Sequence, residues 1–467
     1  MIAQAAGTRW IAGDVAPALG ATVEGDSSAT FVAVVTDSRE ARPGSAFFAL
    51  DGSRHRGAEF VPAAFGSGCS VVVVPMDWRG EIPPGRCALR VSDPLAALVG
   101  LARARRDAWT CPVLAVTGSA GKTTVKEMTA HVLAADRRVL RSPGNFNTPV
   151  GLSRTILDAK EAPEIAVLET GASAPGEIAR LAGLVRPTAA CVTNVAPAHL
   201  EGFGSVARVR EEKLDLLRAV PPGGARLVDG DDPELVRAAE REGARVTKLG
   251  TGPENEPRLA RVEILPDGGT RYRLADGTEG TLAVPGEHQA KNALFAIAFA
   301  QAHGVARGEA ARRLATFRGV PGRLALRTVA HVLIADDSYN SNPASARAAL
   351  QWFEALPREG RKAVALGDML ELGADAPRHH EELGRSVAGA RFDLAVFVGE
   401  SARAAWTAAS ATLAPGSCVH RATSEEAAAL VAAWVRPGDA VLVKGSRGIR
   451  MERVVEALAA REESGAR

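Results

Sequence analysis

The chain has 467 residues, with 56 lysines and arginines against 54 aspartates and glutamates, and a formal net charge of +2. This balance gives no overall field that favours nucleic acid or an anionic membrane, so neither is an expected partner. The five cysteines are odd in number and form no CxxC pair, which argues against disulfides and a zinc site. No signal-peptide pattern opens the chain and no apolar stretch reaches the roughly 20 residues that span a bilayer, so a cytoplasmic protein is expected.

At a usual domain size of ~150 residues, this length predicts about three domains. The first part contains short apolar runs, FVAVV, SAFFAL and SVVVV, separated by turn-rich pieces. This pattern is typical of a small α/β domain. A helical piece, DPLAALVGLARARRDAW, then leads to Cys111 and Pro112, where the pattern changes. We therefore expect the first domain to cover residues 1–106.

The next part alternates strands with helices. The predicted strands VLAVT, IAVLET, AACVTNV and ARLVDG are each followed by a helical pattern, which predicts a parallel sheet with right-handed crossovers. A hairpin-like stretch, VEILPDGGTRYRLADGTEGTLAV, and a return to helix at 286–316 complete a central domain of residues 107–319.

The sequence VPGR at 320–323 is typical of a hinge. After it, VLIAD, KAVALGD, LAVFVGE and DAVLVKG again alternate with helices, which predicts a C-terminal doubly wound, Rossmann-like domain over 320–467. The expected fold is thus α/β in three domains: a small α/β domain, a parallel-sheet P-loop ATPase domain and the Rossmann-like domain.

The segment VTGSAGKTT, residues 116–124, lies between a predicted strand and a predicted helix. Such a turn presents unpaired backbone N–H groups and the positive end of the helix dipole to an anion. Lys122 adds a charge for the β and γ phosphates, and Thr123 offers a hydroxyl to Mg2+. The generic GxxxxGK[ST] pattern fails by one residue, because Val116 stands at its first glycine and Gly118 lies inside the loop. Nucleotide binding is the favoured interpretation, and an ordinary glycine-rich turn is the alternative.

Three polar residues follow strands that should end at the same sheet edge. Glu169 closes IAVLET, His199 comes just after AACVTNV, and Asn145 follows RVLRS. Ligands bind beyond the carboxyl ends of parallel strands, where a carboxylate can hold Mg2+ and an amide can reach a phosphate. Each residue also has an ordinary structural alternative: a helix-dipole partner for the glutamate, a hydrogen-bonded histidine and a turn asparagine.

The loop TGSAGKTT and three C-terminal strings, DDSYNSNP at 336–343, LGDMLELG at 366–373 and KGSRGIRMERVV at 444–455, together resemble the Mur ligase family. Its members are ATP-dependent amide ligases of peptidoglycan precursor synthesis, and the resemblance covers nearly the whole chain. The C-terminal strings imply the step that joins D-alanyl-D-alanine to the terminal carboxylate of UDP-N-acetylmuramoyl-tripeptide. That step passes through an acyl phosphate and gives UDP-MurNAc-pentapeptide, ADP and phosphate. The motifs apply equally to a tripeptide that ends in diaminopimelate or in lysine.

The resemblance also implies roles for individual residues. The residues of the loop TGSAGKTT would bind the phosphates of ATP. Asn145 would contact the phosphate that is transferred. The magnesium ligands would be Thr123, Glu169, His199 and Lys213. Lys213 matches a lysine that CO2 carbamylates; from the sequence alone it is one charge in the helical run RVREEK, where a solvated helix face is expected. The catalytic set is Lys122, Asn145, His199 and Lys213, and the full set of ATP contacts is Gly118, Ser119, Ala120, Gly121, Lys122, Thr123, Thr124, His288, Asn292, Arg323 and Asp337.

Substrate contacts follow from the same comparison. DSREARPGSAFFALDG is similar to the family segment that receives the UDP-sugar, which places Ser38 and Arg39 near the uridine diphosphate. Tyr339, Asn340 and Lys444 belong to C-terminal strings and are implied substrate contacts. The N-terminal domain would then bind the UDP-sugar, and the C-terminal domain would contribute to ATP and D-Ala-D-Ala binding. The family is largely monomeric, so a monomer is expected.

Other functions are compatible with a phosphate loop. A sibling ligase that adds a different amino acid and a folylpolyglutamate-type relative are the nearest alternatives, and the C-terminal strings argue against both. A P-loop ATPase that makes no bond would hydrolyse ATP without an amine and a carboxylate. A non-enzymatic nucleotide-binding module would bind ATP and release no phosphate.

Overall fold

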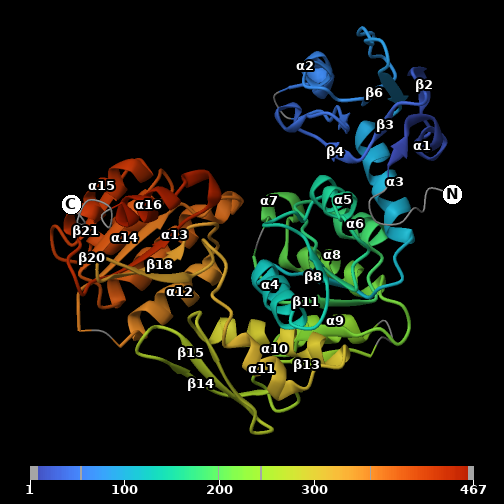
Figure 1. Ribbon diagram of the computed structural model, residues 1–467. Coiled ribbons are helices and arrows are strands. Elements are labelled where there is room, and N and C mark those ends of the chain that lie inside the picture. Colours follow the sequence, from blue (N-terminus) through green and yellow to red (C-terminus); the bar gives the residue numbers. More distant parts are fainter. Residues whose placement is uncertain (1–8, 53–54, 198, 242–244, 358, 461–467) are drawn as a thin grey trace.

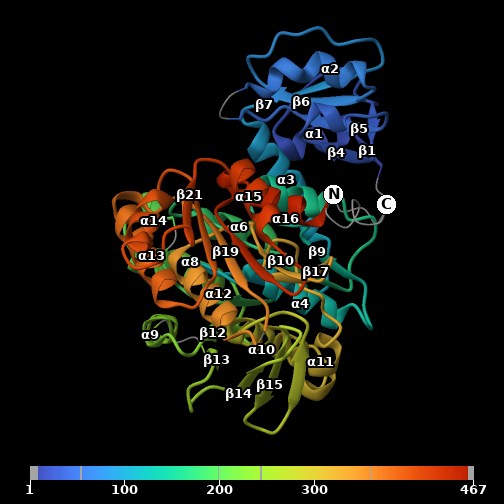
Figure 2. The ribbon, with the colours of Figure 1, turned by 90° about the vertical axis from the view of Figure 1, so that its left-hand side faces the viewer.

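The computed structural model describes residues 9–52, 55–197, 199–241, 245–357 and 359–460. The chain forms three sheet-containing parts. Figure 1 shows the N-terminal part in blue above the green central part, with the orange and red C-terminal part beside the central one. Figure 2 gives the same order from the side, with the N-terminal sheet above the other two parts.

The N-terminal part is built on a five-stranded sheet with the order β2-β7-β6-β5-β4, in which β2 is antiparallel to β7 and the other pairs are parallel. A short pair of antiparallel strands, β1 and β3, lies beside it. The strands are β1 (Trp10–Ile11), β2 (Thr22–Gly25), β3 (Thr30–Phe31), β4 (Ala33–Val35), β5 (Ser45–Phe48), β6 (Val71–Pro75) and β7 (Cys87–Val91). The helices are α1 (Ala12–Leu19), α2 (Val61–Gly66) and α3 (Pro94–Asp107), with 3-10 turns η1 (Ser38–Glu40) and η2 (Gly57–Phe60).

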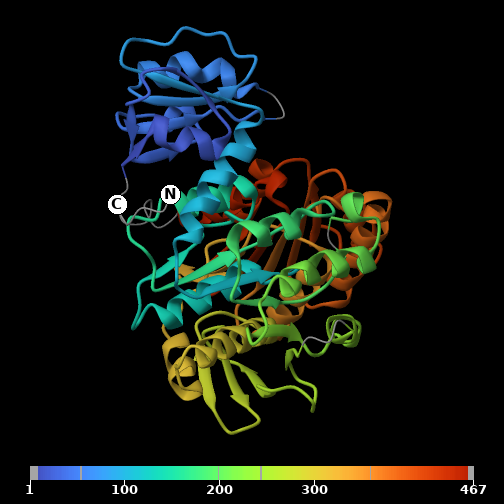
Figure 3. The same ribbon diagram turned by 90° about the vertical axis from the view of Figure 1, so that its right-hand side faces the viewer.

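Helix α3 joins the N-terminal and central parts, as Figure 3 shows at the base of the blue sheet. It begins at Pro94, preceded by Asp93, whose carboxylate accepts the N–H of Leu95 and caps the helix. It packs against α1 and, on the central side, against α5 and α6. Its buried Arg106 donates to the carbonyl oxygens of Val185 (2.7 Å) and Arg186 (2.8 Å) at the end of α6. The helix therefore fixes one part on the other through both apolar packing and hydrogen bonds.

The central part is a six-stranded, wholly parallel sheet with the order β13-β12-β11-β8-β10-β9. Every residue of β8 and β10 is buried, as expected for strands covered on both faces. The strands are β8 (Val113–Thr117), β9 (Val139–Arg141), β10 (Ile165–Glu169), β11 (Ala189–Val192), β12 (Arg226–Asp229) and β13 (Thr247–Leu249). The helices are α4 (Lys122–Leu133), α5 (Pro149–Leu157), α6 (Glu177–Val185), α7 (Leu200–Phe203), α8 (Val206–Arg218) and α9 (Pro233–Glu240).

An antiparallel sheet and two helices follow, drawn in yellow and green at the bottom of Figure 1. The predicted hairpin is a three-stranded sheet of β14 (Leu259–Ile264), β15 (Thr270–Leu274) and β16 (Glu279–Leu282). The predicted helix at 286–316 is divided into α10 (Glu287–Ala302) and α11 (Arg307–Leu314), because Gly304 adopts φ +86° between them. Helix α10 packs along α4.

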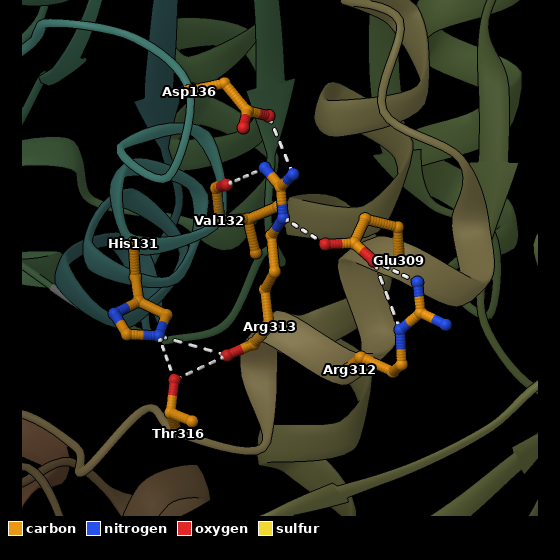
Figure 4. A network of polar contacts seen from close by, with 7 residues as sticks. All are labelled: His131, Val132, Asp136, Glu309, Arg312, Arg313 and Thr316. Atoms are coloured by element: carbon orange, nitrogen blue, oxygen red, sulfur yellow. Dashed lines mark hydrogen bonds and ion pairs between the residues drawn. The ribbon is translucent and has the colours of Figure 1, made fainter.

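A polar network ties the C-terminal end of α4 to α11 (Figure 4). The Arg313 guanidinium donates to the Val132 carbonyl at 2.8 Å and pairs with the Asp136 carboxylate at 2.7 Å. In the other direction, His131 Nε2 lies 3.0 Å from the Arg313 carbonyl oxygen and 2.8 Å from Thr316 Oγ1. The network therefore fastens the helix that begins at Lys122 to the segment that leads into residues 320–323.

The C-terminal part is a six-stranded sheet with the order β17-β18-β22-β19-β20-β21, in which the edge strand β17 is antiparallel and the others are parallel. Helices cover both faces. The strands are β17 (Ala325–Val329), β18 (Val332–Asp337), β19 (Lys362–Gly367), β20 (Leu394–Val398), β21 (Cys418–Arg421) and β22 (Ala440–Lys444). The helices are α12 (Pro343–Ala355), α13 (Ala376–Gly389), α14 (Ala402–Ser410), α15 (Ser424–Trp434) and α16 (Glu452–Ala459), with 3-10 turns η3 (Gly373–Asp375) and η4 (Arg447–Ile449).

The predicted α/β class and its parallel sheets are confirmed. The predicted boundary after residue 106 falls in the last turn of α3, and that after residue 319 falls between α11 and β17; both boundaries stay predictions. Within the described residues, no helix combines the length and the apolarity needed to cross a membrane.

Candidate active site

A cavity of about 560 Å³ lies where the central and C-terminal parts face each other. The central part contributes the phosphate loop, the end of β10 and the start of α10. The C-terminal part contributes the residues that follow β18, β19 and β22. The cavity therefore lies at the carboxyl ends of strands from two sheets, where α/β proteins bind ligands.

The phosphate loop is shaped by two glycines and fastened to the segment after β11. A Cβ on Gly118 would lie 1.9 Å from Thr193 Oγ1, and a Cβ on Gly121, which has φ +79°, would lie 2.6 Å from Asn292 Oδ1. The Ala120 N–H donates to Asn194 Oδ1 at 2.9 Å. A side chain at either glycine would push the loop off its supports. The N-terminus of α4, with its unpaired N–H groups, therefore stays open to the cavity.

Lys122 is the first residue of α4, and its ammonium group lies over the loop, donating to the Gly118 carbonyl at 2.8 Å. Burial lowers the pKa of Lys122; Glu169 opposes this shift and Arg323 adds to it. These effects place one carboxylate and a second cation near the ammonium group. A polyphosphate bound here would meet Lys122 directly, as the sequence predicts.

Glu169 and Thr123 form the oxygen pair expected of a magnesium site. The Thr123 hydroxyl donates to Glu169 Oε2 at 2.9 Å, and Asn147 Nδ2 donates to Oε1 at 2.8 Å. Within the described part of the chain, no three His, Cys, Asp or Glu side chains gather as a metal site. Mg2+ takes oxygen ligands and is commonly bound by one or two carboxylates together with substrate phosphates. One carboxylate and one hydroxyl beside a phosphate loop fit that mode.

Of the two further residues assigned to magnesium, His199 reaches the cavity and Lys213 does not. His199 lines the cavity, and its Nδ1 is 2.6 Å from Glu371 Oε2 of the C-terminal part. Burial lowers the pKa of His199, and the Glu371 carboxylate opposes that shift. Lys213, on α8, is buried and does not line the cavity; burial, reinforced by the charge of Lys122, lowers its pKa to about 7. The sequence-based expectation of a solvated helix face for Lys213 is therefore wrong.

The C-terminal wall is a cluster of paired charges at the ends of two adjacent strands. Asp337 ends β18 and Lys444 ends β22, in register with each other, and Lys444 Nζ lies 2.6 Å from Asp337 Oδ2. The same ammonium group donates to the Asn340 carbonyl at 3.0 Å. The Arg323 guanidinium stacks on the Tyr339 ring, 3.9 Å from its centroid. These predicted residues all line the cavity.

The start of α10 forms the part of the wall next to the phosphate loop. His288 and Asn292 both line the cavity, as predicted, and Asn292 Nδ2 donates to Gln289 Oε1 at 3.0 Å. Burial, with a smaller effect of the Lys444 charge, lowers the pKa of His288 to about 4, so its imidazole is neutral near pH 7. Asn145, in the loop after β9, also lines the cavity.

The structure does not bring Ser38 and Arg39 to this cavity. Both lie in η1 of the N-terminal part, and the Arg39 side chain is 88% exposed, with its Nε donating to Asp37 Oδ1 at 2.9 Å. Glu40 in the same turn pairs with Arg154 of α5 at 2.8 Å. This turn therefore sits where the N-terminal part meets the central one.

Sequence reasoning missed two residues that line the cavity, Asn147 and Glu371, and one buried residue that supports it, Lys126. Asn147, which holds Glu169, stands two residues after the predicted Asn145, and the repeated asparagine of GNFN is a signal that could have found it. Lys126 is fully buried beneath the 142–147 loop; its spacing of four residues from Lys122 places both on one helix face. Glu371 pairs with a residue 172 positions earlier, and no local pattern predicts that contact.

Comparisons with known proteins agree with this geometry. The family model for the Mur ligase middle domain matches residues 116–300, and the model for the Mur ligase glutamate ligase domain matches residues 322–447. The UDP-N-acetylmuramoyl-tripeptide--D-alanyl-D-alanine ligase of Bacillus subtilis is 34% identical over 431 residues, covering 91% of this chain and 92% of the relative.

Two solved structures are similar over most of their length. A crystal structure of MurF from Acinetobacter baumannii has a TM-score of 0.86 and 31% identity, covering 97% of this chain and 99% of the other. The structure of MurF ligase from Thermotoga maritima in complex with ADP has a TM-score of 0.80 and 29% identity, covering 93% and 98%.

Proposed function

The chain belongs to the Mur ligase family, and we propose that it is the ATP-dependent ligase that joins D-alanyl-D-alanine to the terminal carboxylate of UDP-N-acetylmuramoyl-tripeptide. The products are UDP-MurNAc-pentapeptide, ADP and phosphate. The observation that carries the proposal is the cavity in which Lys122, Thr123 and Glu169 of one part face the polar cluster of another. A phosphate loop by itself is sufficient for an ATPase. The polar cluster of the C-terminal part supplies additional groups that can bind the D-alanyl-D-alanine acceptor.

The chemistry follows from the poor leaving ability of a carboxylate oxygen. The tripeptide carboxylate attacks the γ-phosphorus of ATP, and the bond between that phosphorus and the β–γ bridging oxygen breaks. ADP is released, and the tripeptide carries an acyl phosphate. The D-Ala-D-Ala amine then attacks the acyl carbon, and the tetrahedral intermediate collapses with loss of phosphate and an amine proton. Exclusion of water protects the acyl phosphate from hydrolysis.

The protein's contribution is charge and position. Lys122 and the α4 N-terminus stabilise the charge that develops on the phosphoryl oxygens, the largest effect expected for phosphoryl transfer. Arg323 adds a second cation from the C-terminal part. Asn145 is assigned to the transferring phosphate, and His288 and Asn292 to the adenosine side of ATP. Bound Mg2+, held by Thr123 and Glu169 with His199 nearby, would neutralise phosphate charge.

Lys213 is proposed to carry a carbamate. Only a neutral amine attacks CO2, and a pKa of about 7 leaves much of the Lys213 amine neutral near that pH. The carbamate would replace a buried cation by an anion beside Lys122, which compensates the repulsion between the two lysines. It would also add a carboxylate-like ligand on the metal side of the site.

The remaining assignments complete the proposal. Residues 1–106 bind the UDP-sugar, with Ser38 and Arg39 near the uridine diphosphate; residues 107–319 bind ATP; and residues 320–467 contribute to ATP and D-Ala-D-Ala binding. Tyr339, Asn340 and Lys444 face the substrates. The protein acts as a cytoplasmic monomer.

The test is phosphate release from ATP and Mg2+ by the purified protein, with UDP-N-acetylmuramoyl-tripeptide and D-Ala-D-Ala supplied separately and together. Release that needs both substrates, with one phosphate per pentapeptide, is the expected result, and Lys122→Met should abolish it. Release without either substrate would instead identify an ATPase. ATP binding without release would identify a nucleotide-binding module, and ligation of a single amino acid in place of the dipeptide would identify a sibling ligase.

A further inference from the structure

Several lysine and arginine side chains line the cavity, and two of them already pair closely with a carboxylate. Among the described residues that line it, the lysines and arginines are Lys122, Lys291, Arg323, Lys444 and Arg447. Lys291 pairs with Asp231 at 2.6 Å, and Lys444 pairs with Asp337 at the same distance. Lys122 and Arg323 lie at the phosphate end. Arg447 is left for a ligand group that the phosphate end does not serve.

Arg447 is held only weakly by the protein. Its Nη1 lies 3.3 Å from Glu452 Oε1, and its side chain is 66% exposed. Glu452 Oε1 is also 3.9 Å from Arg450 Nε, so one carboxylate is shared by two arginines. Exposed ion pairs of this kind contribute ~0–1 kcal/mol. The Arg447 guanidinium can therefore turn to a ligand carboxylate at little cost, and its planar fork matches a carboxylate in bidentate fashion.

The position of Arg447 suits a dipeptide. Its guanidinium carbon is 5.7 Å from the centroid of the Tyr339 ring, and that of Arg323 is 3.9 Å from the same centroid. The Arg323 charge acts on Lys122, so Arg323 marks the phosphate end. Two residues of extended chain span about 7 Å. A dipeptide can thus place its amine at the acyl phosphate and its carboxylate at Arg447, with the Tyr339 ring alongside.

An apolar side chain stands next to Arg447. Leu370 lines the cavity, is 41% exposed and reaches within 2.9 Å of where a Cβ on Gly448 would stand. Its backbone N–H donates to Ser446 Oγ at 3.0 Å, which fixes the loop beside η4. A small alkyl group of a ligand bound to Arg447 would cover this surface.

We propose that Arg447 binds the C-terminal carboxylate of the D-Ala-D-Ala acceptor and that Leu370 contacts its terminal methyl group. This inference rests on the proposed function, which it deepens. Arg447 is thereby a specificity-determining residue: it selects an acceptor with a free carboxylate and orients the amine at the other end.

The test compares D-alanyl-D-alanine with D-alanyl-D-alaninamide, which lacks the carboxylate charge. Initial rates of pentapeptide formation at saturating ATP and UDP-tripeptide are measured for the wild type, Arg447→Gln, Arg447→Lys and the matched control Arg450→Gln. Arg450 lies outside the cavity lining, is 59% exposed and faces the same Glu452.

The wild type should prefer the acid over the amide at least tenfold in kcat/KM. Arg447→Gln should raise the KM for the acid roughly 10- to 100-fold, the loss expected for a charge-assisted hydrogen-bond pair, and should abolish the preference. The KM for ATP should stay within twofold. Arg447→Lys should fall between, and Arg450→Gln should match the wild type.

The inference is overturned if the wild type uses acid and amide equally, if Arg447→Gln keeps the preference, or if Arg450→Gln loses it to the same extent. In each of these cases pentapeptide still forms, so the proposed function stands. Absence of pentapeptide with wild-type protein overturns the proposed function and the inference together.

Discussion

Replacing the buried Lys126 by methionine should loosen the loop that carries the active-site asparagines. The Lys126 side chain is 0% exposed, and its ammonium group donates to the carbonyl oxygens of Ser142 (2.5 Å) and Gly144 (2.8 Å). It also lies 3.0 Å from Glu127 Oε1 and 4.0 Å from Glu169 Oε2. One buried cation therefore holds the start of the 142–147 loop and faces the carboxylate proposed to bind magnesium.

The magnitude follows from these contacts. Hydrogen bonds to a charged group contribute about 1.5–3 kcal/mol each, and removing one partner of a buried ion pair costs about 3–5 kcal/mol. Glu127 keeps Arg141 as a partner at 3.2 Å, so the lower end applies. We expect the Lys126→Met substitution to lower the free energy that holds the loop by about 3 kcal/mol, which corresponds to roughly 100-fold more frequent opening.

Hydrogen exchange followed by mass spectrometry measures this opening directly. Peptides covering residues 142–148 should exchange roughly 100-fold faster in Lys126→Met, and the urea midpoint should fall. The matched control is Lys160→Met, at an exposed lysine after α5, which should change stability by less than about 0.5 kcal/mol. Unchanged protection of 142–148 in Lys126→Met would refute the reasoning, because it would show that the loop is held without the ammonium group.

In buffer freed of CO2, Lys213→Met should raise the unfolding free energy by up to about 5 kcal/mol below pH 7, since burial lowers the pKa of Lys213 from 10.5 to about 7 and one unit is about 1.36 kcal/mol. The gain should vanish as the pH rises from 7 to 10.5, where the unfolded chain loses the same proton; urea titrations that show no gain below pH 7 would contradict this. Gly118→Ala should weaken ADP binding at least tenfold by calorimetry, because its Cβ would lie 1.9 Å from Thr193 Oγ1, and an unchanged Kd would count against the geometry. Arg313→Met should lower the unfolding free energy by about 1–2 kcal/mol, whereas its neighbour Arg312, 76% exposed, should cost under 0.5 kcal/mol; equal effects would deny the network in Figure 4 a stabilising role.

The sequence predicted the sheets because buried parallel strands have continuous apolar sequences. It also predicted which sheet edge carries the site, because each of these apolar runs is followed by a polar residue. Glu169 and Asp337 both follow from that rule. The third antiparallel strand was missed, because the pattern of a short edge strand, EGTL, does not differ from that of a turn. Periodicity also failed for Lys213, since a helix face with charged residues can still be covered by another part of the chain.

No local sequence pattern predicts the contacts between the central and the C-terminal parts. His199 Nδ1 lies 2.6 Å from Glu371 Oε2, and the two residues are 172 positions apart in loops of different parts of the chain. Both adopt positive φ, +51° and +63°, which the sequence does not predict for residues other than glycine. The resemblance supplied the role of Arg323 but not its stacking on Tyr339. Residue types and spacings thus predict which polar residues gather at one sheet edge. Which residues of another part of the chain face that edge can be seen only in the folded structure.

The electrostatics of the cavity link ATP binding to the facing arrangement of its two walls. Lys122 comes from the central part and Arg323 from the start of the C-terminal part. Burial lowers the pKa of Lys122, and the Arg323 charge adds to that shift, so the ammonium charge of Lys122 is costly while no anion is bound. A polyphosphate between them removes that cost, and it gains from both cations only when the two parts stand as they do here. By linkage, whatever favours this arrangement must also favour ATP, and ATP must favour the arrangement by the same free energy. If the acceptor binds on the second wall, as proposed, its binding should therefore depend on the nucleotide that is bound to the first wall.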